Sequence, residues 1–222
     1  MAQVFHRSVN TIAKASIVAA VLLGGIGFYV VTQIARSSYI TGVDVDKQQP
    51  VQFSHKHHSG DDGIDCRYCH TSVETSSYSG YPPTATCMNC HSQIWSDSPY
   101  LEIVRASYRD NKPIEWQKVH DLPDYVYFNH SIHIAKGVGC STCHGNMSEM
   151  PGIHQVNTLQ MEWCLSCHKE PEKFLRPKAE IYNPEWRPEN TTAEQIELGE
   201  QLKVEYKVRG RDLMTACSTC HR

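Results

Sequence analysis

The pattern Cys-x-x-Cys-His constrains this chain more than any other feature of its sequence. It occurs five times and uses all ten cysteines, as Cys66/Cys69/His70, Cys87/Cys90/His91, Cys140/Cys143/His144, Cys164/Cys167/His168 and Cys217/Cys220/His221. The pattern is typical of covalent c-type haem attachment, in which both thiols bond the haem vinyl groups and the adjoining histidine binds the iron. Neither disulfides nor tetrahedral zinc sites require a histidine directly after the second cysteine. The sequence therefore predicts five covalently bound haems c with these histidines as proximal ligands.

The rest of the composition agrees with a fold built around cofactors. The chain has 222 residues but only 5 Phe, against 13 Gly and 11 Pro, and long periodic patterns are few after residue 50. Such a chain needs a source of burial besides its own apolar side chains, and the porphyrins would supply it. We therefore expect a mainly irregular fold with short α-helices wrapped around five haems. The net charge of −3 gives no indication of nucleic-acid binding.

Residues 15–35 contain no charged side chain, and 21 residues are enough to cross a bilayer as a helix. Arg7 and Lys14 precede this run and should remain cytoplasmic, which places the following chain on the periplasmic side. The run is long for a signal peptide, and no Ala-x-Ala-like cleavage site follows it. We therefore expect a cytoplasmic tail (1–14), an uncleaved transmembrane helix (15–35) in the lipid bilayer and a linker (36–50).

A repeat divides the remaining chain. Phe53-x-His55-x-x-His58 precedes the first two haem motifs, and Phe128-x-His130-x-x-His133 precedes the third and fourth. Histidines three positions apart share one face of a helical turn, so each unit can offer two distal ligands to its two haems.

This repeat predicts dihaem module 1 (51–97), a connector (98–127), dihaem module 2 (128–177) and a C-terminal segment with the fifth haem (178–222). A glycine before the first motif of each module, Gly63 or Gly139, is expected to make a tight turn. The fifth haem needs a distal ligand from earlier in the chain. His120 is the first candidate, and His154 or a methionine such as Met147, Met150 or Met161 is the alternative. A methionine would raise the reduction potential of that haem.

The Phe-x-His-x-x-His repeat before Cys-x-x-Cys-His resembles the class III multihaem cytochromes, the c3 and c7 group. In that group the first histidine caps the haem of its own motif and the second caps the next haem. The resemblance therefore implies the ligand pairs His55/His70, His58/His91, His130/His144 and His133/His168.

From about residue 10 onward, the chain also resembles the membrane-anchored pentahaem subunit of alternative complex III. The N-terminal helix, the five motifs and residues 119–128 carry this resemblance. It implies electron transfer at the bacterial inner membrane, from quinol oxidation to a periplasmic cytochrome c, a copper protein or an oxidase. The implied partners are an iron–sulfur/molybdopterin-like subunit, a polytopic quinol-binding subunit and a monohaem cytochrome c.

Two other functions remain open from the sequence. One is an autonomous membrane-anchored quinol dehydrogenase, in which a haem near the bilayer meets quinol directly. The other is a multihaem reductase with one open iron, although no motif has a lysine in place of its histidine. Filled axial positions favour an electron-transfer subunit over an enzyme acting alone, because substrate could not then reach the iron.

Overall fold

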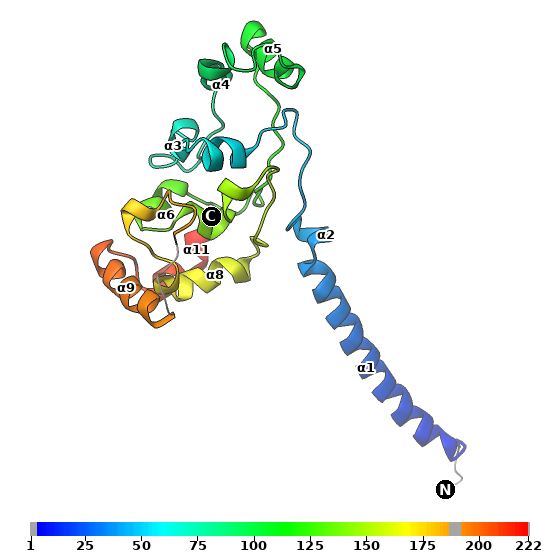
Figure 1. Cartoon of the computed structure of the whole chain (residues 1–222). Coiled ribbons are helices and arrows are strands. Elements are labelled where there is room, and N and C mark those ends of the chain that lie inside the picture. The colour runs from blue at the N-terminus through cyan, green and yellow to red at the C-terminus, as the bar shows by residue number, and fades with distance from the viewer. Residues whose placement is uncertain (1–3, 187–191, 222) are drawn as a thin grey trace. The chain divides into compact units, whose positions relative to one another are not determined.

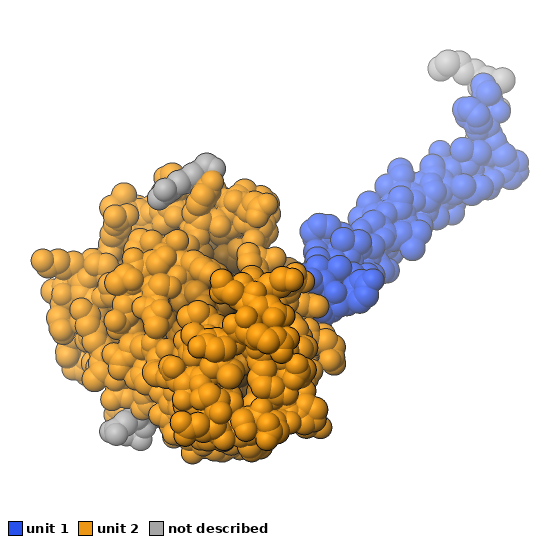
Figure 2. Space-filling view, turned by 90° about the horizontal axis from the view of Figure 1, so that it is seen from above, with its two compact units in different colours: residues 1–43 blue, residues 44–222 orange. Residues whose placement is uncertain are grey.

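The computed structural model describes residues 4–186 and 192–221. The chain divides into two units, residues 1–43 and 44–222, which Figure 2 distinguishes by colour. Helices dominate the described residues, which contain no strand; an isolated antiparallel bridge joins Val138 and Leu175. Parts of two predicted segments, residues 1–3 of the tail and residues 187–191 and 222 of the C-terminal segment, lie outside the described residues.

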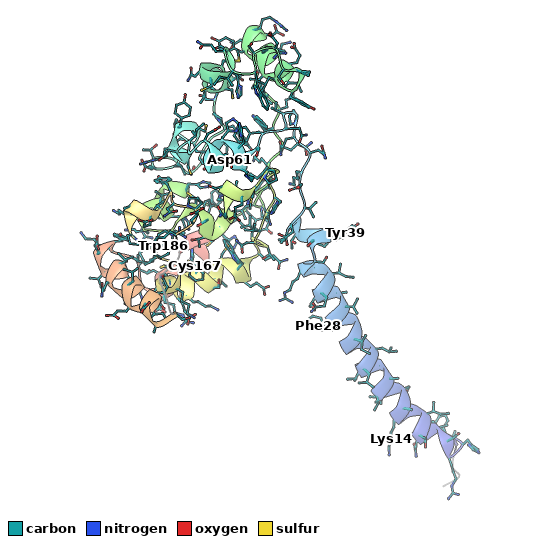
Figure 3. All side chains as sticks on the ribbon, viewed as in Figure 1. Lys14, Phe28, Tyr39, Asp61, Cys167 and Trp186 are labelled. Carbon is teal, nitrogen blue, oxygen red and sulfur yellow. The ribbon has the colours of Figure 1, made fainter. Side chains whose placement is uncertain are left out.

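The first unit is a single long helix, α1 (Ser8–Arg36), followed by one turn, α2 (Ser38–Thr41). Helix α1 begins seven residues before the predicted start and ends one residue after the predicted end. Its side chains have no neighbours to bury them, and Phe28 is 73% exposed (Figure 3). The length and mean hydropathy of 2.1 suit either a membrane span or a signal sequence.

The second unit begins with module 1, whose elements are short. They are η1 (Lys56–Asp61), α3 (Cys66–Cys69), α4 (Thr84–His91), η2 (Pro99–Leu101) and α5 (Glu102–Asp110). Helices α4 and α5 pack together at one end of the unit, shown in green in Figure 1. Val51, Leu101 and Val104 form the small apolar cluster at this end.

Module 2 and the C-terminal segment follow. Their elements are α6 (His130–Ala135), α7 (Cys140–His144), η3 (Met147–Glu149), α8 (Met161–Lys169), η4 (Pro171–Lys173), η5 (Lys178–Glu180), α9 (Thr192–Glu205), α10 (Arg211–Met214) and α11 (Cys217–Cys220). Helix α9 packs on η4 at the opposite end of the unit from α5 (Figure 1). Val138, Leu175, Leu202 and Tyr206 form the second apolar cluster.

The two modules pack against each other through η1 and η3. The Lys56 N–H donates to the Met150 carbonyl at 3.0 Å, and the Ser59 and Ser148 hydroxyls lie 3.3 Å apart. Gly60 allows this approach, because a Cβ there would collide with the Ser148 carbonyl oxygen. Residues 44–222 consequently form one unit.

The protein core is thin, as the composition predicted. Among the described side chains, only Leu175 is less than 2% exposed. Short helices are present as expected, although they make up more of the chain than the predicted mainly irregular fold implied. This architecture leaves most motif histidines and cysteines half-buried between helices rather than sealed in an apolar core, and it leaves Cys90 and Cys217 exposed.

Candidate haem-binding sites

Each Cys-x-x-Cys-His motif lies on a short helix, which places its two cysteines about one turn apart. In α3, for example, the Asp65 carboxylate caps the helix by accepting from the Arg67 N–H at 2.8 Å. All ten cysteines are free thiols in this structure. In residues 4–186 and 192–221, no group of three or more His, Cys, Asp or Glu is arranged to hold a metal ion.

Histidine rings face one another in pairs instead. The ring centres are 6.1 Å apart in His58/His91, 6.4 Å in His130/His144 and 6.2 Å in His133/His168. Two imidazoles that bind one metal ion from opposite sides, with N–metal bonds of about 2 Å, place their ring centres roughly 6 Å apart. The three pairs therefore fit haem iron between them.

In the fourth pair, His70 lies near enough to His55 for its charge to act on that ring. Burial is the main cause that lowers the pKa of His55 to about 4, and the neighbouring His70 and His58 lower it further. Three of the four pairs implied by the resemblance thus have ring centres 6.1–6.4 Å apart, and the role of all four pairs as iron ligands stays a prediction.

The phenylalanine of each repeat contacts both histidines that follow it. Phe53 meets the His55 ring edge-on at 4.9 Å and stacks on His58 at 4.5 Å with an interplanar angle of 24°. Phe128 does the same with the second pair of histidines, at 4.7 Å and at 4.5 Å with the same angle of 24°. The sequence showed this residue as part of a repeat, whereas the structure shows that it orients the rings.

Backbone carbonyls fix the orientation of most of these histidines. An Nδ1–H donates to a carbonyl oxygen in His58 (Ser54, 2.9 Å), His70 (Gly80, 2.9 Å), His91 (Ile94, 3.0 Å), His130 (Ser77, 2.8 Å), His133 (Asn129, 2.7 Å), His168 (Met214, 2.8 Å) and His221 (Tyr125, 3.1 Å). This bond selects the tautomer whose Nε2 lone pair is free to bind a metal. Seven rings are therefore prepared for ligation through Nε2.

Burial also sets the protonation of the candidate ligands. It lowers the pKa of His133 and lowers the pKa of His144 to about 3, so both rings are neutral at physiological pH. Burial raises the pKa of the Cys140 and Cys143 thiols to about 12. Neutral imidazoles suit iron ligation, because the nitrogen that binds the metal must carry no proton.

Comparison with known proteins agrees with this chemistry. The family of cytochrome c7 and related cytochromes c matches residues 126–222, and the class III cytochrome c family matches residues 32–112. The multiheme cytochrome c subunit of menaquinone reductase from Nitratidesulfovibrio vulgaris is 38% identical over 143 residues, covering 55% of this chain and 68% of that relative. The chain belongs to the multihaem cytochromes c of the class III and c7 type. Covalent haem c is the cofactor of these families, while the count of five rests on the motifs alone.

The motifs of this multihaem cytochrome do not follow one another in space as they do in sequence. Four cysteine thiols each have a thiol of another motif close enough to affect their pKa. Burial is the main cause that raises the pKa of each of these four thiols, and the neighbouring thiol raises it further. These inter-motif neighbours are Cys69 with Cys87, Cys140 with Cys66, Cys143 with Cys167, and Cys164 with Cys220. The spatial order is therefore second, first, third, fourth and fifth.

The distal ligand of the fifth motif stays open. The His221 ring lies 5.8 Å from that of Tyr125, and the Tyr127 N–H donates to the Cys220 carbonyl at 2.8 Å. His120, predicted to serve this motif, lies instead against His144, with its Nε2 3.3 Å from Nδ1. Among the described contacts nothing supports His120 as the partner of His221. The alternative His154 is hydrogen-bonded to the Asp46 carboxylate at 3.0 Å.

The turn glycine of module 2 is Gly137 and not Gly139. Gly63 and Gly137 each lie three positions before the first cysteine of their module, with φ of +66° and +83°. Gly139 has φ of −80° and serves another purpose, because the Arg176 guanidinium occupies the space that a Cβ would fill. Counting back three positions from each motif would have identified the pair.

Proposed function

We propose that this multihaem cytochrome is the electron-transfer subunit of a membrane quinol oxidoreductase complex similar to alternative complex III. Bound haem c supplies one-electron redox chemistry, while the polypeptide sets spacing, ligation and polarity. The observation that carries the proposal is the close pairing of histidine rings, which would fill both axial positions of the iron at the second, third and fourth motifs. Substrate would have no access to those irons, which favours electron relay over catalysis.

The arrangement of the cysteines indicates where electrons enter and leave. Cys90 of the second motif and Cys217 of the fifth are exposed, whereas the cysteines of the first, third and fourth motifs are half-buried. The second and fifth motifs are also the two ends of the spatial order. We therefore infer that electrons exchange with partners at these two motifs and pass through the other three.

Helix α1 would anchor the subunit in the bacterial inner membrane. Its apolar side chains are unburied, and Arg7 and Lys14 near its N-terminus favour a cytoplasmic start and a periplasmic haem unit. Quinone chemistry would then belong to a polytopic partner, beside an iron–sulfur/molybdopterin-like subunit and a monohaem cytochrome c. The name of the N. vulgaris relative, a subunit of a menaquinone reductase, supports a quinone-linked complex.

The direction of electron flow is tested on the purified complex. We expect quinol to reduce the haems and a periplasmic cytochrome c or copper protein to reoxidise them. The relative's name favours the reverse reaction as the second candidate. Faster turnover from a reduced periplasmic carrier to menaquinone than from quinol to the carrier would establish it.

The isolated subunit separates the remaining alternatives. We expect quinol to leave its haems oxidised, and direct reduction would support an autonomous quinol dehydrogenase instead. Exposure of the reduced subunit to carbon monoxide tests for an open iron. A large spectral change on carbon monoxide binding would favour the reductase alternative.

A further inference from the structure

His144 differs from the other proximal histidines in the partner of its Nδ1. The other four direct Nδ1 to a backbone carbonyl oxygen, whereas Nδ1 of His144 lies 3.3 Å from Nε2 of His120. The two rings are nearly perpendicular, at 74°, with centres 4.2 Å apart. The predicted distal partner, His130, faces His144 in a parallel arrangement, with an interplanar angle of 8°. His120 therefore contacts the nitrogen of His144 that would not bind iron.

The surroundings of His120 suit a hydrogen-bond acceptor. The His120 ring is half-buried, and its Nε2 lies against Nδ1 of His144. A neutral ring with its proton on Nδ1 presents the Nε2 lone pair to the Nδ1–H of His144. An imidazole nitrogen is more basic than an amide carbonyl oxygen and takes a larger share of that proton. This raises the basicity of His144 toward a metal.

We propose that His120 is a positioning residue for His144, accepting its Nδ1 hydrogen bond and lowering the reduction potential of the haem at the third motif. A more basic axial ligand favours the oxidised iron, which carries the higher charge. The proposal rests on the proposed function in one respect, that His144 binds haem iron. The third motif lies in the middle of the spatial order. Electrons that pass between the modules would therefore pass through its haem, whose reduction potential His120 would lower.

The test uses the full-length protein with its haems attached. His120→Phe keeps a ring but removes the acceptor, and His120→Gln keeps a polar acceptor no more basic than a backbone carbonyl. His6→Phe is the control, because His6 is also a histidine outside the motifs but lies beside Ser8 rather than against a motif histidine. Haem content, spin state and the reduction potentials are measured by mass spectrometry, electron paramagnetic resonance and spectroelectrochemical titration.

We expect all haems of His120→Phe to stay attached and low-spin, with one reduction step moved to higher potential. The same step should move less in His120→Gln and not at all in His6→Phe. A high-spin haem in either His120 variant would overturn the proposal, because it would make His120 an iron ligand. Unchanged potentials in His120→Gln would also overturn it, including the case in which His120→Phe loses haem.

These potentials are measured without quinone, carrier or partner subunits. A complex that fails to turn over would therefore contradict the proposed function and leave the role of His120 standing. Conversely, unshifted potentials in a complex that oxidises quinol would contradict only the role of His120.

Discussion

The two modules reach the same ring arrangement through different backbones. His58 and Cys66 are eight positions apart, whereas His133 and Cys140 are seven apart. Module 1 absorbs its extra residue in η1, a π-helical turn in which the Asp62 N–H donates to the His57 carbonyl at 2.9 Å. The corresponding segment of module 2, α6, is an ordinary α-helix. Phe-to-His stacking is nonetheless the same in both, which indicates that ring placement matters more than local backbone form.

The two modules differ more in the helices and hydrogen bonds that stabilise them. Helix α9 braces module 2, because the Gln195 side chain donates to the Glu172 and Leu175 carbonyls at 2.9 Å each. Module 1 has α5, linked to α4 by the Thr84 and Ser107 hydroxyls at 2.7 Å. Buried Nδ1 of His55 has no hydrogen-bond partner in the part of the chain described here. Module 2 is therefore expected to be the more rigid of the two.

Loss of one haem attachment motif should have the largest effect on stability. The size of this effect should depend on where the motif lies in the spatial order. The double variant Cys140→Ser/Cys143→Ser removes the third motif, whose loop packs beside the Val138–Leu175 cluster. We expect four haems by mass spectrometry and a loss of at least about 3 kcal/mol of unfolding free energy, the scale of deleting a large buried group. The control Cys87→Ser/Cys90→Ser removes a motif at one end and should cost less. Equal losses would contradict the central position of the third motif.

A glycine substitution should distinguish the two turns. In Gly137→Ala the new Cβ would lie 2.6 Å from the Tyr206 ring, whereas in Gly63→Ala nothing lies within 4 Å. Both carry left-handed strain of about 1–2 kcal/mol, and Gly137→Ala adds an overpacking cost of about 1–3 kcal/mol. Denaturant unfolding of the haem-loaded variants measures both. A Gly63→Ala variant as unstable as Gly137→Ala would show that packing does not separate the turns.

The α9 brace should make module 2 sensitive to acid. Lys203 and Glu172 are paired at 2.9 Å, with side chains 29% and 15% exposed. Burial acts to raise the pKa of Glu172, but the Lys203 hydrogen bond, a backbone hydrogen bond and the charges of Lys203 and Lys173 together lower the pKa below 4.5. The stability from this pair is thus present above pH 4.5 and is lost as pH falls through the lowered pKa.

We expect Lys203→Met to lose about 1–2 kcal/mol at pH 7, as for a partly buried ion pair. The difference from wild type should shrink as the pH falls below 4.5. Lys173→Met is the control, because its pair with Glu170 is more exposed, and it should cost little at any pH. A Lys203→Met deficit that persists at low pH would point to lost packing rather than lost charge.

Helix caps should give the smallest difference. The Asn129 side chain accepts from the Ile132 N–H at the start of α6, and the Ser54 hydroxyl accepts from the His57 N–H at 3.2 Å. Each alanine substitution should cost about 1 kcal/mol, or a melting shift of roughly 2–4 °C for a unit of this size. We expect Asn129→Ala to lower the melting temperature more than Ser54→Ala does, because α6 is a regular α-helix and η1 is not. Reversal of that order would argue that η1 depends on its cap more than α6 does.

The sequence by itself determined the chemistry of this protein. Haem attachment could be predicted locally, because each predicted site needs only two cysteines and a histidine within five residues, and the Phe-x-His-x-x-His spacing places two histidines on one turn. The thin core, the long apolar N-terminal helix and the cytochrome family followed from the same local patterns.

Only the tertiary structure decided how the sites relate to one another. The second–first–third–fourth–fifth order arises because η1 of module 1 packs on η3 of module 2. The contact of His120 with His144 joins residues 24 positions apart, and Gly139 is needed because Arg176 reaches it from 37 positions away. No local pattern marks such contacts, because they depend on how distant segments pack.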